Sequence, residues 1–373
     1  MTLAYRETGQ DSELLIGIDL GTSRTAVATS QHYRAIIRSV VGYPRDIIGA
    51  KLLGALCVFG DEALDKSSAV DLYMPLKDGV IKEGQEKEQK AAQDLLEHVV
   101  TEARQGHGGR LCGIIGVPAR ASILNKEMLL GIASRVLDVS VVVSQPFMVA
   151  YYMNKLHNCI VVDLGAGTVD VCGMKGTVPT AEDQVTILKA GEYIDERLAG
   201  LIGQEHPDVQ LSRTLVRTIK EAHAFVGPPA APVLVTLRDS DGRPHPYDLT
   251  EEIRTVCESI VGDVVEQVKV VLRSFAPEHQ AQALQNIYLA GGGSRIKGLD
   301  RLLVDQLGEC GEAQVTCVDD PDYAGCEGAL RLATDLRPEY WSQLGVVARR
   351  EAPPEPAASP AGPASNQEEG GRS

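Results

Sequence analysis

Two short stretches of this chain combine an acid with a glycine-rich turn, and such a combination can hold both a phosphate and a metal ion. In residues 160–171, IVVDLGAGTVDV, apolar β-formers lead to Asp163, a Gly-Ala-Gly-Thr turn follows, and an alternating Val-Asp-Val leaves it. Glycines let the backbone approach a ligand, N–H groups of the turn can face a phosphate, and an acid at a strand end can hold hydrated Mg²⁺. Taken alone, the stretch also fits an ordinary glycine-rich β-hairpin.

The second stretch repeats the first in the other half of the chain. Residues 17–27 read GIDLGTSRTAV and align without a gap on residues 161–171, so that Asp19 falls on Asp163. Two copies, one opening each half, predict two similar domains that face one ligand.

Composition sets bounds on the kind of protein this is. A chain of 373 residues exceeds the roughly 250–300 residues over which one core usually grows, so we expect two or more lobes. The formal net charge of −15 argues against binding to nucleic acid or insertion at an anionic membrane surface. The eight cysteines show no CxxC pair and no metal spacing, which favours reduced thiols in a cytoplasmic protein. We find neither a secretory signal nor an apolar run near the ~18 residues of a membrane span.

Alternating strand and helix patterns predict an α/β fold. Within it, apolar residues on one face predict a helix over 85–102, and the turn Gly-Gly-Gly-Ser at 291–294 follows a predicted strand. The pattern over 250–275 predicts one long helix capped by Thr250.

The predicted domain organisation has four parts. Residues 1–13 are predicted to be disordered, and so is the Pro/Ala/Glu-rich tail at 341–373. Between them we expect lobe I at 14–158, with a small subdomain at 34–74, and lobe II at 159–340, with a small subdomain at 190–249.

Five spaced segments together resemble the actin superfamily, which includes actins, heat-shock chaperones and sugar kinases. IGIDLGTSRTAV and IVVDLGAGTVDV look like its two phosphate motifs, LAGGGSRIKGL looks like its adenosine motif, and GIIGVPAR and CVDDPDYAGCEGALRLA sit where its connecting motifs belong. The resemblance implies an actin-like ATPase fold. Its two duplicated lobes are mixed five-stranded sheets flanked by helices, with a nucleotide cleft between them.

Within the superfamily, PLKDGVI is similar to the filament-forming bacterial actins. VVGYPRDIIGAKLLG, VSQPFMVAYY and LKAGEYIDERL look closest to the branch that aligns magnetosomes in magnetotactic bacteria. The resemblance therefore implies a cytoplasmic, cytoskeletal ATPase that polymerises with itself, organises magnetosomes and binds magnetosome-associated proteins.

The resemblance also assigns the site residues. Asp19 and Asp163 match acids that hold Mg²⁺, largely through water. The residues expected at the β- and γ-phosphates of ATP or ADP are Gly21, Thr22, Ser23, Gly165, Ala166, Gly167 and Thr168. Those expected at the adenosine are Lys220, Glu221, Gly291, Gly292, Gly293 and Ser294.

The predicted catalytic residues are Gln145, Asp163 and Asp170. Gln145 stands where many bacterial relatives carry a glutamate that polarises the attacking water. A neutral amide can orient water but cannot take its proton, so Gln145 suits positioning rather than general-base catalysis. Asp170, beside the second turn, is the alternative group for that task, although an acid leaving a turn is as often a capping residue.

Two other functions remain open. A sugar or acetate kinase would need a second-substrate pocket with its own catalytic acid, and no motif for one is present. A nucleotide-gated adaptor of the cell-division type is the third alternative, which pelleting with and without ATP separates from a filament protein.

Overall fold

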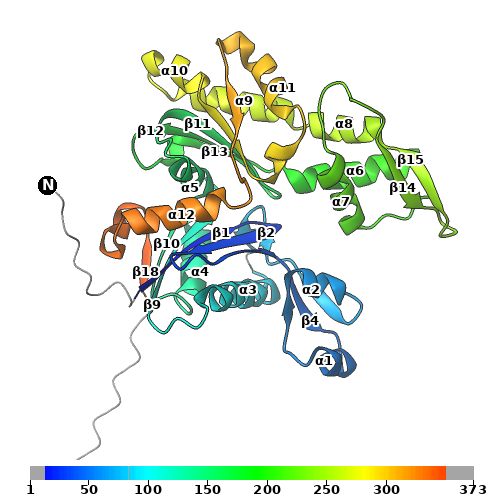
Figure 1. Cartoon of the computed structure of the whole chain (residues 1–373), viewed down its shortest axis with the longest axis horizontal. Coiled ribbons are helices and arrows are strands. Elements are labelled where there is room, and N and C mark those ends of the chain that lie inside the picture. Colours follow the sequence, from blue (N-terminus) through cyan, green and yellow to red (C-terminus); the bar gives the residue numbers. More distant parts are fainter. Residues whose placement is uncertain (1–12, 83, 350–373) are drawn as a thin grey trace, which may run out of the picture.

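The computed structural model describes residues 13–82 and 84–349, and these form two lobes that lie one above the other in Figure 1. Each lobe is built on one large mixed sheet. No helix in the described part of the chain is long and apolar enough to cross a bilayer.

The sheet of lobe I has six strands in the order β18-β10-β9-β1-β2-β3. They are β1 (Glu13–Leu20), β2 (Arg24–Thr29), β3 (Arg34–Arg38), β9 (Arg110–Val117), β10 (Val139–Ser144) and β18 (Val347–Arg349). β1 runs antiparallel to β2 and parallel to β9, so the sheet is mixed. β9 and β10 are apolar almost throughout because both faces of this sheet are covered by helices.

The sheet of lobe II has five strands in the order β13-β12-β11-β16-β17. They are β11 (His157–Leu164), β12 (Val169–Lys175), β13 (Gln184–Ile187), β16 (Ile287–Ala290) and β17 (Val315–Cys317). The antiparallel pair β11–β12 corresponds to β1–β2 of lobe I, and β11 also pairs in parallel with β16. The hairpin that the repeated motif predicts thus occurs in both sheets.

Helices α5 (Gln145–Tyr152) and α12 (Ala324–Asp335) pack between the two sheets. One apolar cluster joins strand residues of both lobes to these helices, among them Ile114, Val161, Met148 and Leu332. The outer faces are covered by α3 (Glu86–Arg104) and α4 (Ile123–Ala133) in lobe I, and by α9 (Val261–Arg273), α10 (Pro277–Leu284) and α11 (Leu299–Leu307) in lobe II. The lobes therefore share one core where α5 and α12 pack between their sheets.

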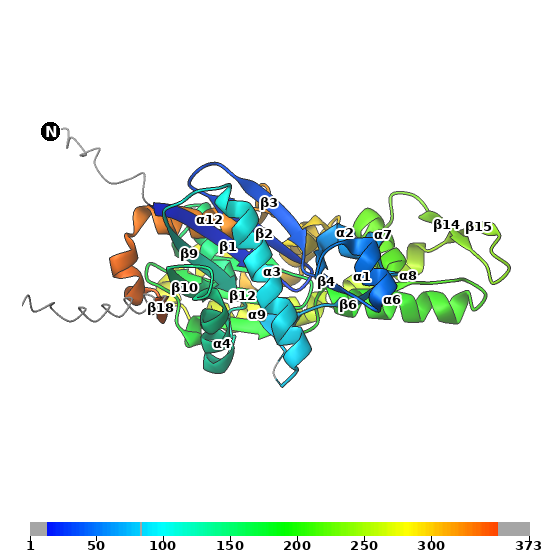
Figure 2. The same ribbon diagram turned by 90° about the horizontal axis from the view of Figure 1, so that it is seen from below.

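Each lobe carries an insertion, and both insertions lie at the same end of the molecule (Figures 1 and 2). The insertion of lobe I contains β4 (Val41–Pro44), α1 (Ile47–Leu53), β5 (Val58–Phe59), α2 (Gly60–Asp65) and β6 (Val70–Tyr73), followed by the hairpin β7 (Leu76–Lys77) and β8 (Val80–Ile81). That of lobe II contains α6 (Gly191–Glu205), α7 (Arg213–His223), β14 (Leu234–Arg238) and β15 (Pro244–Asp248), with α8 (Thr250–Glu258) packed on α6. The 3₁₀ turns are η2 (Ala181–Asp183), η3 (Gly292–Arg295), η4 (Gly308–Cys310) and η5 (Pro338–Gln343).

The turn η2 is held by a capping box. The carboxylate of Asp183 accepts hydrogen bonds from the backbone N–H and the hydroxyl of Thr180, and from Lys175 Nζ at 2.6 Å. Burial raises the pKa of Asp183, but these bonds from Lys175 and Thr180 outweigh burial, and the pKa falls below its usual value. The ionised form of Asp183 thus stabilises the turn.

Three predicted boundaries were wrong. Arg34–Arg38, predicted to open the small subdomain, is strand β3 of the main sheet and pairs with β2. Glu13, predicted to be disordered, begins β1 and accepts a hydrogen bond from Arg110. The predicted tail at 341–373 begins too early, because Trp341 is fully buried and Val347–Arg349 pairs with β10. The first sheet thus has six strands, not five, while residues 1–12 and 350–373 lie outside the described range.

The single long helix predicted over 250–275 is also wrong, because the helix breaks at Ser259 and Ile260 into α8 and α9. Thr250 is its first helical residue rather than its cap. The hydroxyl of Thr250 instead accepts a hydrogen bond from the N–H of Val233 at 2.7 Å, which ties the start of α8 to the residue before β14.

Candidate functional site

The site is built on the turn after β1 and the turn after β11. In the first, the N–H of Gly21 donates to the carbonyl of Arg24 at 3.1 Å, and in the second the N–H of Gly165 donates to the carbonyl of Thr168 at 2.9 Å. The same bond closes both turns because the same acid-Leu-Gly sequence precedes them. The repeated motif therefore forms two equivalent turns.

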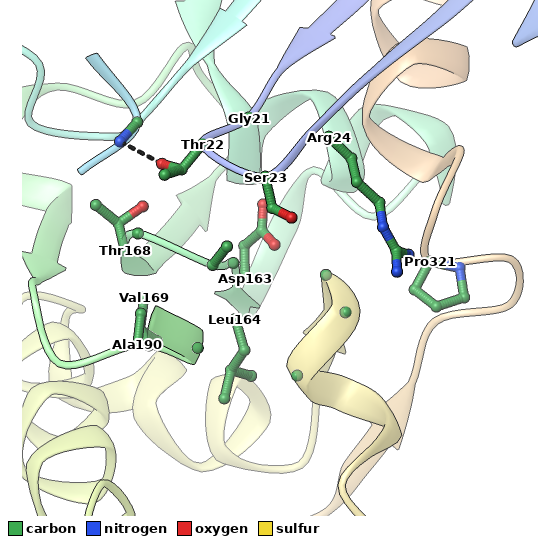
Figure 3. A pocket seen from close by; sticks show the side chains of 18 of the residues that line it. Gly21, Thr22, Ser23, Arg24, Asp163, Leu164, Thr168, Val169, Ala190 and Pro321 are labelled. Carbon is green, nitrogen blue, oxygen red and sulfur yellow. Dashed lines mark hydrogen bonds between the residues drawn. The ribbon is translucent and has the colours of Figure 1, made fainter. Parts of the chain in front are cut away.

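The two turns face each other across a cavity of about 400 Å³ (Figure 3). A Cβ added to Gly167 would lie only 2.3 Å from Thr22 Oγ1, so the turns of the two lobes nearly touch. The Thr22 hydroxyl also accepts a hydrogen bond from the N–H of Gly79 at 2.7 Å, drawn as a dashed line in Figure 3. The volume lies within the roughly 300–1,000 Å³ typical of ligand pockets.

All but one of the predicted site residues line this cavity. They are Asp19, Gly21, Thr22, Ser23, Gln145, Asp163, Gly165, Ala166, Gly167, Thr168, Asp170, Lys220, Glu221, Gly291, Gly292 and Gly293. The exception is Ser294, which is buried behind the lining and donates a hydrogen bond to the carbonyl of Gly291 at 2.7 Å. Ser294 thus supports the turn.

Asp19 and Asp163 bring two half-buried carboxylates to the same cavity. Burial raises the pKa of Asp19, although the hydrogen bond from Gln145 opposes that shift. Burial also raises the pKa of Asp163, and the like charges of Asp19 and Asp170 raise it further. Both acids would therefore be stabilised in their charged form by a cation.

The donor set fits Mg²⁺ held through water. Mg²⁺ usually binds one or two carboxylates together with several waters and the phosphates of its nucleotide. Asp19 and Asp163 supply two carboxylates, and the described residues contain no cluster of three or more His, Cys, Asp or Glu that would form an all-protein cage.

Gln145 lies at the first position of α5, where β10 ends. Its Nε2 donates to Asp19 Oδ1 at 2.7 Å and, more weakly, to the carbonyl of Leu20 at 3.4 Å. Only 8% of the side chain is exposed. The amide therefore links the carboxylate of the first motif to the cavity wall on which α5 begins.

Asp170 uses both carboxylate oxygens within the protein. Its Oδ1 accepts from the N–H of Ala119 and the hydroxyl of Thr186, and its Oδ2 accepts from the hydroxyl of Thr168. Burial raises the pKa of Asp170 to about 6, against the lowering effect of these three bonds. Such a carboxylate positions the second turn, and this geometry favours the capping alternative over the role of general base.

Helix α7 carries the predicted adenosine residues along one wall. Lys220 Nζ donates to the carbonyl of Gly191 and forms an ion pair with Asp195, both at 2.8 Å. The N–H of Gly191 in turn donates to the carbonyl of Gly165, so Lys220 is tied to the second phosphate turn. Glu221 is 40% exposed and faces the opening.

The glycine turn after β16 forms the floor beside the second turn. Gly291 has φ +71°, a left-handed conformation that favours glycine, and a Cβ there would lie 2.4 Å from Asp163 Oδ1. At Gly292, by contrast, an added Cβ would meet open space. Glycine thus lets this backbone pass against Asp163 while leaving the cavity side free.

Several residues that line the cavity were missed by sequence reasoning, among them Arg24, Gly79, Arg295 and Asp322. Arg24 lies inside the first motif, so the sequence could have placed it at the cavity. Its partners could not be predicted, because they are remote in sequence. Arg295, at the end of η3, and Asp322, between β17 and α12, form an ion pair at 2.7 Å. Only the folded structure brings them together.

Two duplicated lobes with paired glycine turns over a shared cavity define an actin-like nucleotide-binding fold. The family described as MreB/Mbl protein matches residues 13–339. The chain is 50% identical over 336 residues to the actin-like protein MamK of Magnetospirillum gryphiswaldense, a match that covers 90% of this chain and 93% of that protein.

Solved structures agree with this match. A MamK double helical filament superposes with a TM-score of 0.85 at 48% identity, covering 87% of this chain and 99% of the other. A non-polymerising MamK mutant bound to AMPPNP gives a TM-score of 0.68 at the same identity and coverage. The chain therefore belongs to the MreB/Mbl family of bacterial actin-like proteins, and both the predicted family and the predicted fold are confirmed. The kinase alternative is not favoured.

Proposed function

We propose that this chain binds ATP with Mg²⁺ in the cleft between its lobes, hydrolyses it to ADP and phosphate, and polymerises with itself into dynamic filaments. The observation that carries the proposal is the pair of equivalent turns, Gly21–Ser23 and Gly165–Thr168, that face each other beside the half-buried carboxylates of Asp19 and Asp163. Relatives with the same fold are described as a filament and as bound to AMPPNP.

The residues divide the binding task by position. The backbone N–H groups of the two turns hold the β- and γ-phosphates from opposite lobes. Lys220, Glu221 and the glycine turn at 291–293 hold the adenosine. Asp19 and Asp163 hold the hydrated Mg²⁺, which neutralises charge on the phosphates when bound. Because the phosphates contact both lobes, ATP binding favours the closed cleft.

Hydrolysis requires a water aligned with the γ-phosphate. Gln145 lies on the cavity wall next to Asp19 and orients that water by hydrogen bonding, without taking its proton. Asp170 keeps Thr168 and the second turn in place. Loss of the γ-phosphate removes contacts between the turns, which loosens the closed cleft and with it the polymer.

Sedimentation of the full chain tests this function. We expect the protein to pellet with Mg·ATP and to remain in the supernatant with ADP or without nucleotide. ADP formation should need no acceptor molecule, whereas a kinase would form ADP only with a sugar or acetate present. Protein that stays in the supernatant with Mg·ATP at high concentration would contradict the proposal.

We also propose that the filaments lie in the cytoplasm alongside magnetosome membranes and bind magnetosome-associated proteins. The identity to MamK supports this role. Correlative light and electron microscopy of a fluorescent fusion in a magnetotactic cell tests it. Filaments that run without regard to the magnetosome chain would contradict it.

A further inference from the structure

Two side-chain contacts cross the mouth of the cleft between the first phosphate turn and helix α7. Arg24 Nη2 of lobe I lies 3.0 Å from Glu221 Oε2 of lobe II. Arg217 Nη1 of lobe II donates to Ser23 Oγ of lobe I at 3.1 Å. Each lobe therefore sends one arginine to the other lobe.

The spacing on both sides explains why the two contacts form together. Arg217 and Glu221 are four residues apart on α7, so their side chains lie on the same face one turn apart. Ser23 and Arg24 are adjacent in the turn that lines the cavity. Two neighbouring residues of one lobe thus meet two neighbouring positions of the other.

Other charges hold both arginines in place. Arg24 Nη1 lies 3.6 Å from Asp322, which also pairs with Arg295 at 2.7 Å. Figure 3 shows the Arg24 side chain extended across the cleft toward the loop that carries Pro321. Arg217 lies 3.5 Å from Asp195 of α6, within its own lobe. The arginines are therefore oriented even where they reach across the opening.

We propose that Ser23, Arg24, Arg217 and Glu221 form an interlobe latch that sets how fast the nucleotide leaves the cleft. The inference rests on the proposed binding of ATP between the lobes. A nucleotide held by both phosphate turns leaves only when the lobes separate, and separation breaks both contacts of the latch. Arg24 and Arg217 are thus positioning residues that slow release.

The structure also limits the size of the effect. The side chains of Arg24 and Glu221 are 34% and 40% exposed, so solvent and salt screen their attraction. Loss of one such exposed pair changes an equilibrium or rate by about 2- to 5-fold. We expect changes of this size in the rate of nucleotide release.

The test measures release of a fluorescent ATP analogue, with Mg²⁺ present, after a chase with unlabelled ATP, at protein concentrations too low for polymerisation. Arg24→Met and Arg217→Met should each release the analogue about 2- to 5-fold faster than wild type. Arg24→Lys, which keeps the charge, should restore part of the slow release. The matched control is Arg110→Met, because Arg110 is 40% exposed and pairs with Glu13 at 2.8 Å within lobe I, at the end of β1 opposite the first turn.

The salt dependence of the release rate is a second readout, because a purely structural role of Arg24 would not change it. Higher ionic strength should speed release from wild type and change release from Arg24→Met much less. Melting temperatures without nucleotide check the fold, and if Arg24→Met is unstable, Arg217→Met and the salt response of wild type decide the matter.

Equal release rates in wild type and Arg24→Met, or an equal effect of Arg110→Met, would overturn the latch while leaving ATP binding intact. A wild-type protein that binds no analogue would overturn the proposed function itself, and the latch with it.

Discussion

Replacing Gln145 by glutamate asks whether this side chain acts by positioning water alone. In the structure the amide Nε2 donates to Asp19 Oδ1 at 2.7 Å, and Gln145 itself is almost closed to solvent. Gln145→Glu exchanges this donor for an acceptor of nearly the same shape. The variant gains a general base and loses the hydrogen bond to a half-buried carboxylate.

The two effects are similar in size. Two carboxylates at ~4 Å repel by about 4 kcal/mol at an effective dielectric constant near 20. General-base catalysis supplies about 10²–10⁴-fold, or roughly 3–5 kcal/mol. At neutral pH the new carboxyl and Asp19 should therefore share a proton, while Mg²⁺ offsets part of the repulsion. We expect faster hydrolysis by about 10²-fold or less, with a modestly higher KM, and a ratio to wild type that rises with pH.

The variant should also be less stable without nucleotide. Because its shared proton has a folded pKa above that of a free carboxyl, the folded state binds more protons than the unfolded state, and stability falls as the pH rises through that folded pKa. The test measures steady-state phosphate release and melting temperature from pH 6 to 9, about the range in which such proteins are stable. It compares wild type, Gln145→Glu and Gln145→Ala. Gln145→Ala should be slower than wild type. If it is equally fast, Gln145 only packs at the strand end, and if Gln145→Glu is slower at every pH, the side chain does not reach the attacking water.

Three further changes test other parts of the molecule. Asp163→Ala should abolish phosphate release, because the variant loses several kcal/mol of transition-state stabilisation. Filaments that still form should persist. Unchanged phosphate release would refute the assignment of the second phosphate turn. Truncation after Arg349 should leave the melting temperature and turnover nearly intact. Truncation after Tyr340 removes the buried Trp341 and strand β18, so calorimetry should show a free energy of unfolding lower by about 3–5 kcal/mol. Equal melting temperatures of the two truncated proteins would refute the docking of residues 341–349. Asp183→Asn should destabilise the fold by about 1–2 kcal/mol at pH 7. The difference in stability between wild type and variant should vanish as the pH falls through the lowered pKa of Asp183. If that difference persists at about pH 2, roughly two units below the usual pKa of Asp, the charge of Asp183 is not its cause.

The sequence was sufficient to predict the two glycine turns because the residues that form each turn are adjacent in the chain. Each turn is closed by a bond between residues three apart, Gly21 to Arg24 and Gly165 to Thr168, so the acid and glycines that define it are adjacent in the chain. The duplication then implied that two such turns share one ligand. The structure places them across one cavity.

Features that depend on remote partners were not predictable in the same way. The apolar periodicity continues through Ser259 and Ile260, and the nearby Gly262 lies inside α9, so the break between α8 and α9 cannot be located from the pattern alone. Strand β18 is recognisable only by its pairing with β10, a strand that lies roughly two hundred residues earlier in the chain. The contact between Arg24 and Glu221 likewise joins residues that only the closed cleft brings together.

The most direct test of ATP-driven assembly records light scattering, phosphate release and electron micrographs during one reaction of the full-length protein with Mg·ATP. We predict that filaments appear first, that phosphate release follows assembly, and that the filaments disappear once ATP is consumed. ADP in place of ATP should give neither scattering nor filaments. Phosphate released at the full rate with no filaments at any protein concentration, or filaments that form equally well with ADP, would contradict it.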